Sequence, residues 1–367
     1  HGVDRNQAKL FKPSMTIATA LDKVGYYTVS AGKYLNGIRH IKDKTPPGWD
    51  DIYMTDGVGE YNYKEYANGK LILRGFGNDD FQTDVVAKRI LDAVRDTSPD
   101  KPIFAVASFR ATHNLHATKH PEPARRNIGA KNCRNIPDWR PPNYNEKDVS
   151  DKPRYVRNAP PLREPHSMDL TKVCESMQGV EDMAKKLFKL LKKTGRNKNT
   201  LVFLTSDNGM TFGAHGLIHK ETPDATPVPL FVRWPAVIEK GRKEKEPVMN
   251  IDIAPTICHI VPNCHLGPYP TGQKNSDGVS LDAIIRGTNH ELDRDEVLIN
   301  HWYGNKTLGI PGWKGIVTEN GWMYIQYKTG ETELYKPKDR WHLNSLARLD
   351  KYRDKKRQLQ NEMKSLR

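Results

Sequence analysis

The segment 201–209 reads LVFLTSDNG and joins an apolar run to a group of polar residues. Its first four residues are apolar without alternation, which is typical of a strand buried on both faces of a parallel sheet. Asp207 and Asn208 follow that strand, and their carboxylate and amide oxygens suit a hard cation such as Ca²⁺ or Mg²⁺. Asp-Asn-Gly is also typical of an ordinary turn. The segment therefore predicts a strand that carries either a turn or a cation site at its end.

Strand and helix patterns alternate on both sides of this segment. Apolar residues at helical spacing predict helices at 14–24, 84–94 and 173–191, and apolar runs predict strands at 27–30, 103–109 and 230–232. This alternation indicates an α/β fold with a mostly parallel central sheet between helix layers. Sites in such sheets lie beyond the carboxyl ends of the strands. That rule directs attention to Lys33, His113 and Asp207, because each follows a predicted strand.

The pattern changes at about residue 290. Short apolar runs at 297–299, 315–317 and 323–325 predict strands with turns between them, and a basic helix is expected from about Leu343 to Leu366. We therefore expect two domains: an α/β domain over 1–290, and a small α+β domain over 291–367 with an antiparallel sheet and one helix. Within the first, the segment 127–165 is rich in Pro, Asn, Arg and Asp and has no periodicity, which predicts a long surface excursion.

Composition narrows the classes of partner. The 367 residues carry a net charge of +14, which favours anionic substrates, nucleic acid or anionic membranes as partners. No nucleic-acid motif and no run of about 18 apolar residues is present, so we expect neither nucleic acid nor membrane as a partner. The spacing of Cys133, Cys174, Cys258 and Cys264 matches no zinc site. Cys258 and Cys264 could pair or remain free thiols, which leaves the redox compartment open.

A series of short motifs runs in order along the whole chain. They are GKYLNG at 32–37, ATH at 111–113, SDNG at 206–209, GAHGL with a lysine at 213–220, VPLFVRWP at 228–235, DIAPT at 252–256, and ELY to NSLA at 333–347. This order resembles the type I sulfatases, which depend on formylglycine and belong to the alkaline-phosphatase superfamily. Within that family the chain resembles the branch that holds N-acetylglucosamine-6-sulfatases, extracellular heparan endosulfatases and arylsulfatase-like proteins.

The resemblance implies a role for each candidate residue. Lys33 would hold the nucleophile and neutralise sulfate oxygens, and Lys220 would contact the sulfate group or the leaving oxygen. His113 would protonate the leaving alkoxide, a task that suits imidazole near neutral pH. Asp207 and Asn208 would bind Ca²⁺, with Mg²⁺ as the other possible ion. The histidine of the GAHGL motif, His215, is expected to pack or to support the site and not to catalyse.

The chain departs from the family pattern in ways that bear on activity. No C-x-P-x-R or S-x-P-x-R motif occurs, although relatives carry it shortly before an HGV-like stretch such as 1–3. We therefore expect the formylglycine, its arginine and the paired metal-binding aspartates upstream of this chain, and we expect the chain alone to be inactive. Pro223–Pro227 is shorter than the family's acidic turn and lacks its arginine, and Thr112 replaces a proline.

The resemblance implies a sulfuric ester hydrolase that acts on a sulfated carbohydrate, such as a 6-O-sulfated glucosamine unit, or on an aryl sulfate. One alternative is a phosphodiesterase or phosphonate hydrolase of the same superfamily, and another is a non-catalytic binder of sulfated polysaccharide. The family also suggests a secreted, periplasmic or lysosomal location, whereas no motif predicts an oligomeric state.

Overall fold

The computed structural model describes residues 3, 7–41, 44–114, 120–137, 139–162, 169–267, 277–292 and 294–366. Its largest sheet has five strands in the order β4-β3-β2-β1-β5. Their bounds are Tyr27–Gly32 for β1, Asp51–Asp56 for β2, Lys64–Ala67 for β3, Lys70–Leu73 for β4 and Ile103–Ser108 for β5. The central strand β1 pairs in parallel with both β2 and β5, and β3 and β4 add an antiparallel hairpin at one edge.

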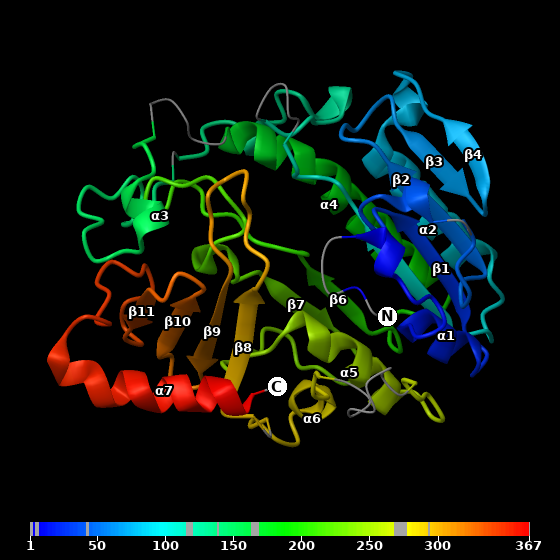
Figure 1. Cartoon of the computed structure of the whole chain (residues 1–367). Helices are drawn as coiled ribbons and strands as arrows, with labels where there is room; N and C mark the ends of the chain where they lie inside the picture. The colour runs from blue at the N-terminus through cyan, green and yellow to red at the C-terminus, as the bar shows by residue number, and fades with distance from the viewer. Residues whose placement is uncertain are drawn as a thin grey trace.

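Helices cover both faces of this sheet (Figure 1). On one face, α2 (Gln82–Asp96) packs on the strands and α4 (Leu170–Lys193) packs on α2, around Val29, Val86 and Met183. On the other face lie α1 (Ile17–Asp22) and α5 (Ile253–Ile260), in a cluster that includes Phe104 of β5. Phe104 pairs with Thr28, the residue next to Val29, and neighbouring residues of a strand point to opposite faces, so Val29 and Phe104 reach opposite clusters. The α/β layer architecture expected from the sequence is confirmed.

The strand that precedes Asp207 belongs to a separate two-stranded sheet. Here β6 (Val202–Thr205) pairs antiparallel with β7 (Leu230–Arg233), and among the described residues neither is hydrogen-bonded to the five-stranded sheet. Leu204 is 51% exposed and Phe231 64% exposed. The prediction that these two segments are buried on both faces is wrong, because among the described residues only the face with Phe203 and Val232 packs in an apolar cluster.

The C-terminal residues form a four-stranded antiparallel sheet in the order β11-β10-β9-β8. The strands are β8 (Glu296–His301), β9 (Trp313–Thr318), β10 (Met323–Tyr327) and β11 (Thr332–Tyr335). One face is covered by α7 (Arg353–Ser365), whose Leu359 and Met363 pack on Ile316 and Tyr324. This is the sheet and single helix that the sequence predicts, and the domain boundary near residue 290 remains a proposal.

The last helix begins ten residues later than predicted. The expected start was about Leu343, whereas α7 begins at Arg353 after a short 3₁₀ turn. The backbone amides of Leu343 and Asn344 donate to Asp339, and that of Ser345 donates to Asp151. Side-chain acceptors thus compete successfully with helical hydrogen bonds in this segment.

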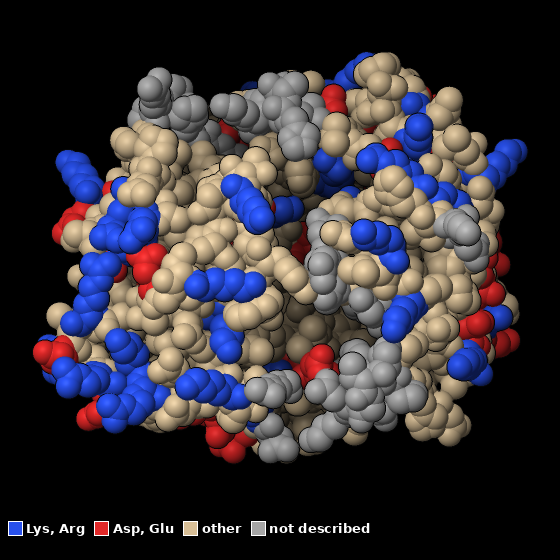
Figure 2. All heavy atoms as spheres, in the orientation of Figure 1, with Lys and Arg blue, Asp and Glu red and all other residues tan. Residues whose placement is uncertain are grey.

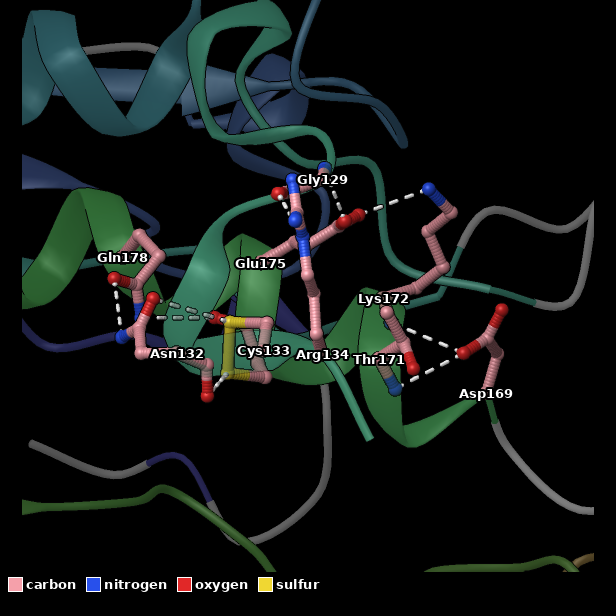
Figure 3. Close-up of a disulfide and its surroundings, with 10 residues drawn as sticks. Gly129, Asn132, Cys133, Arg134, Asp169, Thr171, Lys172, Glu175 and Gln178 are labelled. Carbon is pink, nitrogen blue, oxygen red and sulfur yellow. Dashed lines mark hydrogen bonds and ion pairs between the residues drawn. A yellow bond between two sulfur atoms is a disulfide. The ribbon is translucent and has the colours of Figure 1, made fainter. Parts of the chain in front are cut away.

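Two disulfides fasten the irregular parts of the chain, and they use all four cysteines. Cys258 and Cys264, left open by the sequence, are bonded at the end of α5 with a Cα–Cα distance of 4.8 Å. Cys133 and Cys174, 41 residues apart, join the surface excursion to α4 (Figure 3). Gly129 N donates to Glu175 Oε1 at 2.6 Å beside this bridge. The excursion holds the short helix α3 (Arg154–Arg157), and α6 (Asp282–Arg286) lies beside β6 and β7.

Candidate active site

The backbone fixes Lys33 where β1 and β5 end together. Gly32 and Ser108 are the last partners in the parallel ladder, and Lys33 N donates to Ser108 O at 2.9 Å. Gly32 has a φ of +104°, and a Cβ on it would lie 2.0 Å from Ser108 O. The glycine of the Gly-Lys motif is therefore required by the close approach of the two strands. The Lys33 ammonium donates to Asn36 Oδ1 within the same motif.

The surroundings of Lys33 bring candidate residues together. Burial lowers the pKa of Lys33, and the positive charges of Arg110 and Lys220 lower it further. The negative charges of Asp56 and Asp207 act in the opposite direction. Lys33, Lys220 and Asp207 come from distant parts of the chain, so the structure gathers three of the predicted site residues into one electrostatic cluster. The result is a site with the positive charges of Lys33, Arg110 and Lys220 and the exposed carboxylate of Asp207.

Arg110 is a member of this cluster that the sequence analysis missed. It follows β5 directly, and its Nε and Nη1 donate to the carbonyls of Val58 and Gly57, both at 2.9 Å. Burial lowers the pKa of the guanidinium, and its Nη2 donates to no described residue. The available signal was its place at the same strand end as His113, between the apolar run and the histidine.

His113 lies in the turn that follows Arg110. Its backbone N donates to Arg110 O at 2.7 Å, and its Nδ1 lies 2.8 Å from Asn114 O. A carbonyl oxygen only accepts, so Nδ1 carries the proton and Nε2 is the basic nitrogen of the neutral ring. The imidazole is exposed, as a group that exchanges protons with a ligand needs to be. The structure thus holds the His113 backbone against that of Arg110, in the turn after β5.

The Asp-Asn-Gly segment is shaped by the chain that crosses it. Gly209 N donates to Ala225 O at 3.0 Å, and a Cβ on Gly209 would lie 2.6 Å from that oxygen. Asn208 Nδ2 donates to Gly209 O at 3.0 Å, which leaves its Oδ1 to accept. Asp207 is exposed and has no hydrogen bond or ion pair among the described residues. Both side chains can therefore offer an oxygen to a cation.

These two oxygens fit part of a calcium site. Ca²⁺ takes roughly six to eight oxygen ligands. The described residues contain no group of three or more His, Cys, Asp or Glu side chains that could hold a metal. Asp207 and Asn208 therefore need further ligands from elsewhere to complete a shell.

Lys220 is positioned by a loop that closes on itself. Thr211 N donates to His219 O at 3.0 Å, and His219 N donates to the buried hydroxyl of Thr211 at 2.8 Å. Lys220 follows this closure and is exposed. The next residue, Glu221, accepts at its backbone oxygen from the indole of Trp313 at 2.8 Å. The C-terminal sheet thus supports the segment that carries Lys220.

The tip of this loop is buried in a network of charges. His215 is 5% exposed, with its Nδ1 2.6 Å from Glu146 Oε2 and its Nε2 3.4 Å from Asp224 Oδ1. His342 Nδ1 lies 2.7 Å from the same Asp224 oxygen. Burial opposes the charge on His215, but its bonds to Asp224 and Glu146 outweigh burial and raise its pKa to about 9. The hydrogen bonds of the two histidines likewise hold the pKa of Asp224 far below its usual range, against the effect of burial. His215 therefore has a structural role, because its contacts with Glu146 and Asp224 hold the tip of the loop.

Solved structures establish the class of fold. One protein, solved in complex with its substrate D-glucosamine-2-N,6-O-disulfate, aligns with a TM-score of 0.76 at 18% identity, over 95% of this chain and 81% of that chain. The phosphonate monoester hydrolase of Agrobacterium radiobacter aligns with a TM-score of 0.67 at 18% identity, over 98% of this chain and 80% of that one. The fold is of the alkaline-phosphatase type, which more than one activity shares.

Sequence comparisons then identify the family. Residues 2–263 match the family model for sulfatases, and residues 213–367 match the model for the C-terminal part of N-sulphoglucosamine sulphohydrolase. The chain belongs to the sulfatase family. It is 31% identical over 313 residues to human N-acetylglucosamine-6-sulfatase, covering 80% of this chain and 53% of the relative. It is 26% identical over 367 residues to the arylsulfatase of Volvox carteri, covering 86% of this chain and 55% of that protein. The chain thus spans about half the length of these relatives.

Proposed function

We propose that this protein hydrolyses sulfate esters of carbohydrates, and that a 6-O-sulfated glucosamine unit is its preferred substrate. The observation that carries the proposal is that the charges of Arg110, Lys220 and the exposed carboxylate of Asp207 all act on the Lys33 ammonium. A sulfate ester carries negative oxygens, and preorganised cations stabilise the charge that develops on them during ester cleavage.

Each side chain then has a task that fits its surroundings. The Lys33 backbone is hydrogen-bonded to the end of β5, and its ammonium donates to Asn36. The ammonium is therefore preorganised to contact sulfate oxygens. Lys220 is exposed on the opposite segment, where it can reach the sulfate or the leaving oxygen. His113 is the candidate general acid for the leaving alkoxide. No residue of 1–367 lies in a C-x-P-x-R motif, so we assign no nucleophile within these residues.

We propose that Asp207 and Asn208 contribute to a Ca²⁺ site, with Mg²⁺ as the other candidate ion. An exposed carboxylate and an amide oxygen are the donors that such ions prefer. When bound, the ion would supply further positive charge for the sulfate oxygens. The formylglycine nucleophile of the family would have to be adjacent to these same groups.

The substrate class is supported by similarity and by charge. The relatives in the comparison include N-acetylglucosamine-6-sulfatases, and one structural neighbour was solved with a disulfated glucosamine. The net charge of +14 favours a polyanionic ligand. Figure 2 shows basic side chains gathered over α7 and around the middle of the same face.

The disulfides support an oxidising compartment. All four cysteines are paired, and such bonds persist in secreted, periplasmic or lumenal proteins. No helix in the described part of the chain combines the length and apolarity that a membrane span requires. From the paired cysteines we propose a secreted, periplasmic or lysosomal location.

The test is sulfate release from a 6-O-sulfated glucosamine derivative by the full-length protein. We expect Lys33→Ala and Lys220→Ala each to lower kcat by about 10²–10³-fold, the size seen when one transition-state donor is removed. Chelation of divalent ions should abolish activity and added Ca²⁺ should restore it. Lys23→Ala, at an exposed lysine near the end of α1, serves as the control for loss of a positive charge.

The same assay separates the alternatives. Preference for an aryl phosphonate or a phosphodiester over the matching sulfate would favour a phosphonate hydrolase or phosphodiesterase. Binding of sulfated glucosamine without any release of sulfate would favour a non-catalytic binder. Either result would contradict the proposed hydrolase activity.

A further inference from the structure

The connection between β8 and β9 presents two exposed aromatic side chains. Trp302 is 45% exposed and Tyr303 49% exposed. The connection, drawn in orange, rises above its two strands in the middle of the view (Figure 1). Asn305 and Ile310 exchange backbone hydrogen bonds of 2.8 and 3.0 Å across it, so it is a closed hairpin. The aromatic rings are therefore presented from an ordered backbone.

Two lysines lie over these rings. Lys328 Nζ is 4.2 Å from the centroid of the Trp302 ring and 5.9 Å from that of Tyr303. Lys314 Nζ is 5.8 Å from the Trp302 ring. In the part of the chain that the structure describes, neither ammonium forms an ion pair with a carboxylate. We call the surface made by Trp302, Tyr303, Lys314 and Lys328 the Trp302 platform.

The backbone beneath the platform is closely packed. Lys328 N donates to Gly312 O at 2.8 Å. A Cβ on Gly312 would lie 2.1 Å from Trp302 O and 3.1 Å from Lys328 Cδ. A glycine is needed at 312 because the Trp302 backbone and the Lys328 side chain both press against it. The fold therefore brings the Trp302 backbone and the Lys328 side chain together at Gly312.

The platform lies close to the segment that carries Lys220. Asn305, three residues beyond Trp302, donates from Nδ2 to Glu221 Oε1 at 3.3 Å. On the other side of the hairpin, Trp313 donates to Glu221 O at 2.8 Å. Three residues span at most about 11 Å. The platform and Lys220 are thus close enough for one oligosaccharide to contact both.

We infer that the Trp302 platform binds a second sulfated sugar of the carbohydrate chain whose ester lies between Lys33 and Lys220. A sugar ring has apolar C–H faces that can cover an indole, which removes apolar surface from water. Its sulfate groups would meet the ammonium groups of Lys314 and Lys328. We propose a sulfated sugar as the ligand because the platform pairs an apolar ring with two positive charges. The inference rests on the proposed function for the chemistry of the ligand.

The test is a binding titration, followed by tryptophan fluorescence and calorimetry. The probes are a heparin-derived tetrasaccharide and the same tetrasaccharide after chemical desulfation. Trp302→Ala should weaken binding of both about tenfold, and Trp302→Phe should weaken it less, because an aromatic face is kept. Lys328→Gln should weaken only the sulfated probe, by about fivefold, and should reduce the dependence of its affinity on salt.

Trp139→Ala is the matched control. Trp139 is 52% exposed, and its ring packs against Phe212 and Trp341, which are not members of the platform. It should leave the affinity for both probes unchanged. Thermal melts of every variant check that the fold is kept. Wild-type affinity in both Trp302→Ala and Lys328→Gln would overturn the inference. So would a concentration-dependent change in tryptophan fluorescence that Trp302→Phe abolishes, because a second copy of the chain would then cover the platform.

The outcome can be separated from that of the proposed function. Hydrolysis of a small aryl sulfate by the full-length protein should be unaffected by Trp302→Ala, whereas KM for the tetrasaccharide should rise. If Lys33→Ala abolishes hydrolysis but the platform variants bind normally, only the platform is overturned. If no sulfate is released while Trp302→Ala still weakens binding, the hydrolase activity fails and the binding surface stands.

Discussion

The two sides of the candidate site are built in different ways. Lys33 and Arg110 are held mainly by backbone, at the joint end of the parallel strands β1 and β5. Lys220 is held by a loop whose tip, His215, is buried among charged side chains. The first side depends on strand geometry and the second on protonation. The comparison shows that one charged site can be supported on one side by strand backbone, which does not titrate, and on the other side by a loop whose charges depend on pH.

Removing the shared acceptor of the charge network should have the largest effect. Asp224→Ala leaves His215 and His342 without the carboxylate that both contact, and a broken buried pair costs about 3 kcal/mol of unfolding free energy. Urea unfolding would measure the loss. The exposed, unpaired Asp207→Ala is the control, with a change within about 0.5 kcal/mol. Equal losses in the two variants would show that the network does not support the loop.

Gly32→Ala tests the side that is built from backbone. The new Cβ would collide with Ser108 O, so we expect a loss of about 3 kcal/mol and a displaced Lys33. Gly25→Ala is a matched control, because Gly25 also has a positive φ but has nothing within 4 Å of a Cβ. The unfolding free energy of Gly25→Ala should fall by only about 1 kcal/mol. The difference between the two variants isolates the clash from the strain of positive φ.

The pH dependence of stability should come from the His215 side. The folded-state pKa of His215 is about 9, above the value of roughly 6.5 for an unfolded chain. Its contribution is therefore fully present below about pH 6.5 and is lost as pH rises through 9. We expect stability to decline by about 3 kcal/mol over this interval. Urea unfolding of His215→Gln should show a flatter profile, and an unchanged slope would contradict the assignment.

The smallest effect on folding free energy is expected at the exposed strands β6 and β7. Phe231→Lys replaces an apolar side chain that is mostly in water, so unfolding free energy should change by no more than about 0.5 kcal/mol. Self-association should nevertheless fall, because exposed apolar strand edges template contacts between chains. Light scattering against protein concentration measures this. Val232→Lys, on the packed face, should instead destabilise the fold.

Much of the local structure was readable from the sequence. Helical spacing located α2 and α4 to within three residues at each end, because a buried helix face must repeat its apolar residues. The Gly-Lys and Asp-Asn-Gly motifs likewise marked Lys33 and Asp207 by their place after apolar runs. For both motifs the structure adds the reason for the glycine, which is the close approach of a carbonyl oxygen.

What only the tertiary structure decided are the pairings between distant residues. Arg110 became a member of the site because β5 lies beside β1, and Cys133 met Cys174 because the excursion returns to α4. The partners of Asp224 come from residues 215 and 342, so no local pattern could set its pKa. Periodicity and motifs act over a few residues and are written in the chain. Charge coupling, disulfide pairing and exposed edges depend on distances through space, which exist only after folding.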